Sequence, residues 1–135
     1  MADASEEIFG LESIHNDREV LKPRDNIIVH TNHYLTERLK TGDMAAQIFP
    51  DSFKRIERIR YLMDEHYDKI TPKVMIDILS DHENYPYSIC RHVDSSVPPQ
   101  YQSSTLASFI MVPEDGVMYA AAGNPCSFQF AEYMI

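Results

Sequence analysis

Alternating apolar and polar positions near the start of the chain predict a β-hairpin. Residues 7–13 and 18–22 each have the pattern of a short strand, and Asn16-Asp17 between them is a turn signal. Polar and proline residues break the pattern at 23–26. The apolar, β-branched run that starts at Ile27 and ends at Thr31 then predicts a buried strand. We therefore expect strands over about residues 7–31.

Apolar residues at helical spacing follow a segment, residues 36–50, that has no clear period and is expected to be a loop. Pro50-Asp51-Ser52 is a helix start signal, and apolar positions then recur every three or four residues from Phe53 to Tyr67. Thr71-Pro72 marks a second start, because proline suits the first helical position. These signals predict helices over about residues 51–82.

The last third of the chain combines an irregular segment with a second hairpin. Prolines and serines interrupt residues 83–104, although we expect an extended strand at about 87–92. Apolar strands are expected within 105–122, joined by the turn Pro113-Glu114-Asp115-Gly116. Strands on either side of a helix pair predict an α+β fold, in which an antiparallel sheet carries the helix pair on one face. We expect residues 1–135 to be a single partial domain.

Charge and composition narrow the classes of partner. The 135 residues include 21 acidic and 12 basic side chains, for a formal net charge of −9. Nucleic-acid binding and attraction to anionic membranes both need a basic surface, so we expect no nucleic-acid and no membrane partner. No apolar run approaches the roughly 18 residues of a membrane span, and no signal peptide is visible. A cytoplasmic protein is therefore expected.

Polar side chains directly after the Ile27 strand are the first candidates for chemistry. The side-chain amide of Asn32 could donate a hydrogen bond to a developing oxyanion, or it could cap a turn. His30 and His33 flank it, and a separation of three places them on different faces of a strand. A metal site there would need more distant histidines that no pattern fixes in space (His66, His82 and His92). We expect polar histidines bordering a pocket, with no metal and no cofactor.

An arginine and two cysteines complete the candidates. Arg55 follows Ser52 by three residues at a helix start, where it could stabilise a thiolate or pair with a neighbour such as Asp51. Cys90 and Cys126 match no zinc or redox spacing. Cys90 and His92 would share one face of an extended segment, which allows a nucleophilic pair, but a buried structural cysteine is the commoner case.

Three short segments resemble one family of enzymes. Thr31-Asn32-His33-Tyr34-Leu35, the run Ile89-Cys90-Arg91-His92 after an Asp-His pair, and Gly123-Asn124-Pro125-Cys126 are similar to segments of the acyl-coenzyme A:6-aminopenicillanic-acid acyltransferase and amidase family. That family belongs to the N-terminal-nucleophile hydrolases and is related to choloylglycine hydrolases. The similarity runs over residues 2–133.

This resemblance implies a fold, a reaction and roles for residues. It implies the C-terminal half of an αββα sandwich, and an acyltransferase or amidohydrolase acting on an acyl amide or acyl-coenzyme A. Asn32 would belong to the oxyanion hole and Arg55 would lie near the nucleophile. From their place beside Asn32, we expect His30, His33 and Tyr34 to contact the substrate, and His33 could instead orient Asn32.

The family's nucleophile is a cysteine that self-cleavage exposes at a new N-terminus. Cys90 is internal and does not fit that role. We therefore expect a portion of the enzyme that lacks the nucleophile and pairs with a complementary N-terminal chain. The alternatives are a non-catalytic remnant or binding module that self-associates, and an unrelated small α+β interaction domain.

Overall fold

The computed structural model describes residues 8–135, so the predictions made for residues 1–7 lie outside it. The described residues form an α+β structure with antiparallel sheets, as the sequence predicted. The chain divides into two compact units, one ending at Ile56 and the other spanning Glu57–Ile135. The single partial domain expected from the sequence stays a prediction. Each unit is described by itself.

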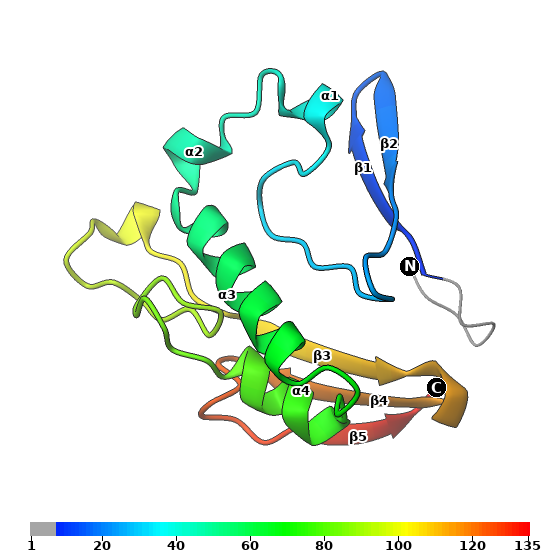
Figure 1. Ribbon diagram of the computed structural model, residues 1–135. Helices are drawn as coiled ribbons and strands as arrows, with labels where there is room; N and C mark the ends of the chain where they lie inside the picture. The colour runs from blue at the N-terminus through cyan, green and yellow to red at the C-terminus, as the bar shows by residue number, and fades with distance from the viewer. Residues whose placement is uncertain (1–7) are drawn as a thin grey trace. The chain divides into compact units, whose positions relative to one another are not determined.

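The first unit begins with a β-hairpin. Strands β1 (Gly10–Ile14) and β2 (Asp17–Leu21) pair antiparallel, with Gly10 opposite Leu21. Close packing against Leu21 favours glycine at position 10, because a Cβ atom there would lie 3.0 Å from Cβ of Leu21. A long connection then leads to the short helices α1 (Glu37–Lys40) and α2 (Ala45–Ile48) and to the start of α3 (Asp51–Glu65) (Figure 1).

Two predictions for this unit were wrong. The run Ile27–Thr31 is not a strand, because its pairing is limited to one bridge between Arg24 and Ile27. An apolar run indicates burial, whereas a strand also needs a neighbouring strand to complete its hydrogen-bond ladder. Residues 36–50 are not all loop, since α1 and α2 lie there and bury Leu39 and Ala45. Helices of one turn are too short to show a periodic pattern.

The second unit packs helices against a sheet. Helix α4 (Pro72–Leu79) starts where Thr71 accepts a hydrogen bond from Val74 N, at 3.3 Å. It lies against β3 (Ala107–Val112), which pairs antiparallel with β4 (Val117–Ala122) (Figure 1). The buried apolar residues of this unit are Leu62, Ile78, Cys90, Ile110 and Ala121.

Two further differences from the predictions concern the second unit. Residues 87–92 form no strand. Contacts such as Cys90 N donating to Asp81 O at 3.0 Å hold this irregular segment instead. The apolar tail adds an unexpected third strand, β5 (Ala131–Met134), so the sheet order is β3-β4-β5. The other regular pieces are single 3₁₀ turns, η1 (Pro99–Tyr101) and η2 (Pro113–Asp115).

The sheet of the second unit has one covered and one exposed face. Along β3, Ser108 and Ile110 are buried, whereas the alternating Phe109 and Met111 are 59% and 61% exposed. Tyr133 on β5 is also exposed, and it pairs with Met118, which in turn pairs with Met111. Because cross-strand partners share a face, these residues form one exposed apolar surface, which we call the open sheet face.

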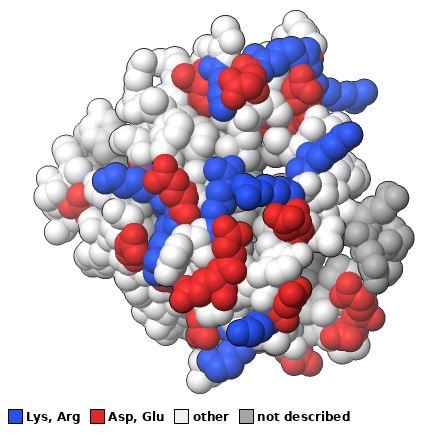
Figure 2. Space-filling view, in the orientation of Figure 1, with Lys and Arg blue, Asp and Glu red and all other residues white. Residues whose placement is uncertain are grey.

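Charged side chains of both signs are interspersed on the surface shown in Figure 2. Ion pairs account for part of this mixing, as where Arg38 binds Asp17 and Glu19 of the β-hairpin. Within residues 8–135, no helix combines the length and apolar character needed to cross a membrane.

Candidate functional site

The buried hydroxyl of Ser52 organises the polar segment of the first unit. Ser52 is the second residue of α3 and is fully buried. Its Oγ accepts a hydrogen bond from the backbone N–H of Asn32 at 2.8 Å and lies 2.8 Å from Nδ1 of His33. It also donates to Oγ1 of Thr31 at 3.0 Å, and Thr31 donates in turn to the carbonyl oxygen of Ser52 at 3.0 Å. The Thr-Asn-His segment is therefore fixed to the start of α3.

These hydrogen bonds define a role for His33. Because the Ser52 hydroxyl donates to Thr31, Nδ1 of His33 can act as the donor to Ser52 Oγ. The His33 side chain is buried and stacks on Phe53 with ring centroids 4.1 Å apart. This geometry favours the interpretation that His33 orients the Asn32 segment. Direct contact of His33 with a substrate stays a prediction.

Arg55 holds the side chain of Asn32. Its guanidinium NH2 donates to Oδ1 of Asn32 at 2.5 Å, and its Nε donates to Oδ2 of Asp51 at 2.8 Å. Arg55 therefore forms the ion pair with Asp51 that was one sequence-based alternative, and it also contacts Asn32. A role of Arg55 in the reaction stays a prediction. Because Arg55 is a donor only, the Asn32 oxygen must face it, and the amide Nδ2 points elsewhere. Within residues 8–135, no acceptor engages that Nδ2, and Asn32 is exposed.

A second buried group, Glu12, holds the chain on the other side of the motif. Its carboxylate accepts hydrogen bonds from Leu35 N at 2.5 Å, from Thr36 N at 3.0 Å and from Thr36 Oγ1 at 2.7 Å. His30 Nε2 lies 2.8 Å from Oε1 of the same carboxylate. Burial acts to raise the pKa of Glu12, but these hydrogen bonds outweigh it and hold the pKa below its usual value of 4.5. Glu12 is therefore a charged anchor.

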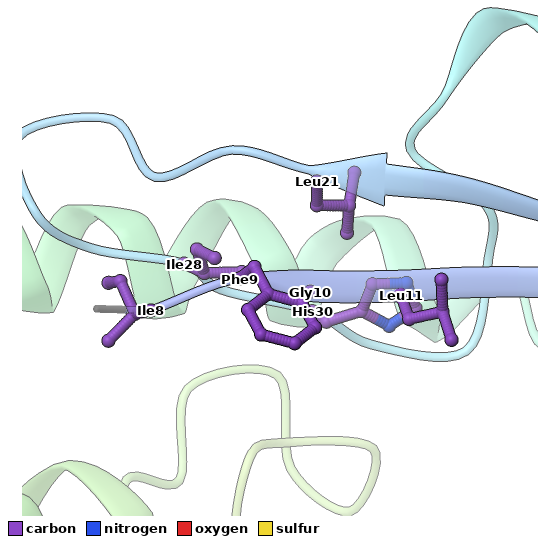
Figure 3. Close-up of a pocket in the computed structure, with 7 residues that line it drawn as sticks. All are labelled: Ile8, Phe9, Gly10, Leu11, Leu21, Ile28 and His30. Atoms are coloured by element: carbon purple, nitrogen blue, oxygen red, sulfur yellow. The ribbon is translucent and has the colours of Figure 1, made fainter. Parts of the chain in front are cut away.

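An apolar hollow of about 420 Å³ lies beside His30 in the same unit. Figure 3 shows its lining, which comes from the hairpin strands, the residues just before β1 and the connection after β2 (Ile8, Phe9, Gly10, Leu11, Leu21, Ile28 and His30). His30 supplies the polar side chain in this lining. Such a hollow suits a nonpolar group that carries a polar end.

The other predicted contact residue, Tyr34, is anchored at both ends. Its backbone N–H donates to Asp43 Oδ2 at 2.8 Å, and its hydroxyl donates to Ser13 O at 3.0 Å. The structure thus brings Asn32, His33 and Arg55 together around Ser52, whereas Tyr34 has separate partners. A substrate contact by Tyr34 stays a prediction.

Sequence reasoning missed the two groups that organise this site. Ser52 was treated as a helix start and as part of the Ser-x-x-Arg signal, which could have indicated its role. Glu12 lies in the first predicted strand, where a polar side chain is expected to face solvent. In the structure its side chain is only 1% exposed. No local pattern distinguishes it from its neighbours.

Cys90 lies in the second unit and has no exposed surface. Its Sγ lies 3.5 Å from Nε2 of His92 and 3.5 Å from Sγ of Cys126. Burial raises the pKa of the Cys90 thiol, and a hydrogen bond from Asn124 offsets only part of that effect. A buried thiol with a raised pKa is a poor nucleophile, which favours the interpretation of Cys90 as a buried structural cysteine.

Comparison with known protein families identifies the family of this chain. The model of the family described as acyl-coenzyme A:6-aminopenicillanic acid acyl-transferase matches residues 1–127. The match includes the Asn32 and Arg55 site and both cysteines, and it confirms the family that the sequence motifs suggested. The chain belongs to the acyl-coenzyme A:6-aminopenicillanic acid acyl-transferase family.

Proposed function

We propose that this chain contributes the oxyanion-stabilising amide of a cysteine acyltransferase or amidohydrolase of the N-terminal-nucleophile type. The substrate class is an acyl amide or an acyl-coenzyme A thioester. The observation that carries the proposal is the contact between Arg55 and Asn32, in which NH2 donates to Oδ1 at 2.5 Å. This contact leaves the amide Nδ2 of an exposed side chain as a hydrogen-bond donor of fixed direction.

The proposed reaction is nucleophilic acyl transfer. A thiolate attacks the carbonyl carbon, a carbon–sulfur bond forms, and the carbonyl π electrons move onto the oxygen. Asn32 Nδ2–H donates to this oxyanion. The oxyanion then collapses, the carbon–nitrogen or carbon–sulfur bond breaks, and the α-amino group of the nucleophile, which took the thiol proton, passes that proton to the leaving amine or coenzyme A thiolate. Water or an acceptor amine attacks the acyl-enzyme and regenerates the thiol. Arg55 and Ser52 are positioning residues, since each acts through Asn32.

The nucleophile in this proposal comes from polypeptide outside this sequence. Cys90 is buried, and the Sγ of Cys126 lies 3.5 Å from its Sγ. Both cysteines belong to the second unit, whereas Asn32 belongs to the first. The open sheet face, with Phe109 and Met111 more than half exposed, supports coverage by a second polypeptide. We propose that the nucleophile-bearing part of the sandwich covers it. Self-association would be the alternative.

The apolar hollow is the proposed binding place of the acyl group. Its volume of about 420 Å³ falls in the range of small-molecule sites. His30 at its edge would contact the polar end of the substrate, with Tyr34 and His33 as further contacts. The cytoplasmic localisation expected from the sequence remains part of this proposal.

Native mass spectrometry on the protein from its own source, combined with an acyl-transfer assay, tests the proposal. We expect a second polypeptide that begins with cysteine, and a complex that cleaves acyl amides or thioesters. Asn32→Ala in that complex should lower kcat by about 10²–10³-fold, the usual loss for one oxyanion donor, with a small change in KM. Asn16→Ala, in the exposed hairpin turn, is the matched control.

Two results would contradict the proposal. One is a complex whose kcat does not respond to Asn32→Ala. The other is a chain that occurs alone or only with copies of itself and has no acyl-transfer activity, which would favour a non-catalytic remnant or binding module.

A further inference from the structure

Four side chains of metal-binding types converge in the second unit. They are His82, Cys90, His92 and Cys126, and their ligand atoms all lie within 4.8 Å of one another. His82 follows α4, Cys90 and His92 lie on the irregular segment, and Cys126 lies in the connection between β4 and β5. Three separate stretches of chain therefore direct two imidazoles and two thiols to one point.

Four of the six separations between these ligand atoms lie close to the edge lengths of a tetrahedron around a metal ion. Nε2 of His82 and Nε2 of His92 are 2.9 Å apart, and the two sulfurs are 3.5 Å apart. Each sulfur also lies 3.5 Å from Nε2 of His92. Tetrahedral zinc, with bonds of about 2.3 Å to sulfur and about 2.0–2.1 Å to nitrogen, requires separations of about 3.8 Å (S–S), about 3.6 Å (S–N) and about 3.3 Å (N–N). The cluster is tighter than this by a few tenths of an ångström.

Hydrogen bonds around the cluster are of the kind that support metal thiolates. Asn124 Nδ2 lies 3.5 Å from Cys90 Sγ and also donates to Arg91 O at 2.7 Å. Ser127 Oγ lies 3.4 Å from Cys126 Sγ. The backbone of the irregular segment is held as well, because His92 N donates to Pro86 O at 2.9 Å. Donors of this type hold and orient a ligating sulfur.

The ligand set indicates the ion. Two thiolates and two imidazoles in tetrahedral arrangement are typical of zinc, and four protein ligands leave no position open for a substrate. From these observations we infer that His82, Cys90, His92 and Cys126 form a closed, structural zinc site. The ion would fix the irregular segment to the end of α4 and to the β4–β5 connection.

This inference replaces the sequence-based expectation of no metal site. The ligands follow one another at separations of 8, 2 and 34 residues, which correspond to no compact zinc motif. The inference stands apart from the proposed acyl transfer, because it concerns other residues in the other unit.

The test is metal analysis of the full chain purified under reducing conditions without chelator. We expect one zinc ion per chain by elemental mass spectrometry. Cobalt(II) in place of zinc should give the visible absorption of a tetrahedral ion and a thiolate-to-cobalt charge-transfer band. Cys126→Ser and His82→Asn, both at exposed positions, should each weaken zinc binding by at least about 100-fold. His15→Asn, in the hairpin turn, is the control and should keep full binding.

A melting experiment separates loss of the ion from loss of the fold. Chelator should lower the melting temperature of the unaltered chain but not that of Cys126→Ser, since only the former has an ion to lose. Three results would overturn the inference: a chain without zinc whose mass shows a Cys90–Cys126 disulfide, zinc binding that survives both substitutions, and a different metal in the isolated protein.

Discussion

Replacing Glu12 by glutamine tests whether a buried charge holds the Asn32 motif in place. Glutamine has nearly the shape of glutamate, but its NH2 group must face either the N–H of Leu35 or the N–H of Thr36, both of which now donate to the carboxylate. At least one buried N–H then loses its acceptor, at a cost of about 1–3 kcal/mol. The remaining hydrogen bonds become neutral and weaken by up to about half. We expect a total destabilisation of about 2–4 kcal/mol.

The measurement is chemical denaturation, combined with amide hydrogen exchange at Leu35 and Thr36. The exchange data give a local value if the two units unfold separately. Protection of these two amides should fall by a factor of about 30–1,000, the equivalent of about 2–4 kcal/mol. Glu37→Gln is the matched control, because that side chain is 89% exposed and its loss should change stability by less than about 0.5 kcal/mol.

The stabilisation by Glu12 should depend on pH in a defined direction. The folded-state pKa of Glu12 lies below 4.5, so its stabilising contribution is present above about pH 4.5 and is lost as the pH falls through the lower, folded-state value. The stability difference between the unaltered chain and Glu12→Gln should therefore be large at neutral pH and shrink in acid. A difference that does not change with pH, or no difference at neutral pH, would refute the assignment of Glu12 as a charged anchor.

Two other substitutions test the packing of each unit. Ser52→Ala should destabilise the first unit by about 2–4 kcal/mol in denaturant melts, because two donors lose a buried acceptor, whereas exposed Ser103→Ala should have little effect. Gly123→Ala puts a methyl group 2.6 Å from the Phe128 ring at a φ of +89°, and we expect a loss of about 2–4 kcal/mol. Gly42→Ala has a similar φ and open space, so an equal loss there would show that strain alone is responsible.

Sequence reasoning succeeded where a pattern is long or its turn chemistry is strong. The 15 residues of α3 and the Thr71-Pro72 start of α4 were both visible in the sequence, and so were the two hairpins. The strand prediction for Ile27–Thr31 failed because an apolar run does not distinguish a β-strand from an extended segment that side-chain hydrogen bonds hold in place. Short elements such as α1 and β5, with four residues each, carry too few positions for a period to appear.

The candidate site was predictable only in part, for a similar reason. Asn32 and Arg55 came from motifs, and the structure brings them together at 2.5 Å. The connecting hydroxyl of Ser52 and the carboxylate of Glu12 depend on contacts 20 and 23 residues apart in sequence, which no local pattern records. The proposed convergence of His82 and Cys126 with Cys90 and His92 was not predicted, because Cys126 lies 34 residues beyond His92 in the chain.

The proposed zinc site bears directly on where the nucleophile of this family must come from. The chain contains two cysteines, and both are ligands in that site. A thiolate bound to zinc in a closed site is not free to attack a carbonyl carbon. If zinc is present, the cysteine for acyl transfer must therefore lie outside these 135 residues, as the proposed function states. If zinc is absent and Asn32→Ala still cripples a complex with a second chain, the metal inference fails while the proposed function stands.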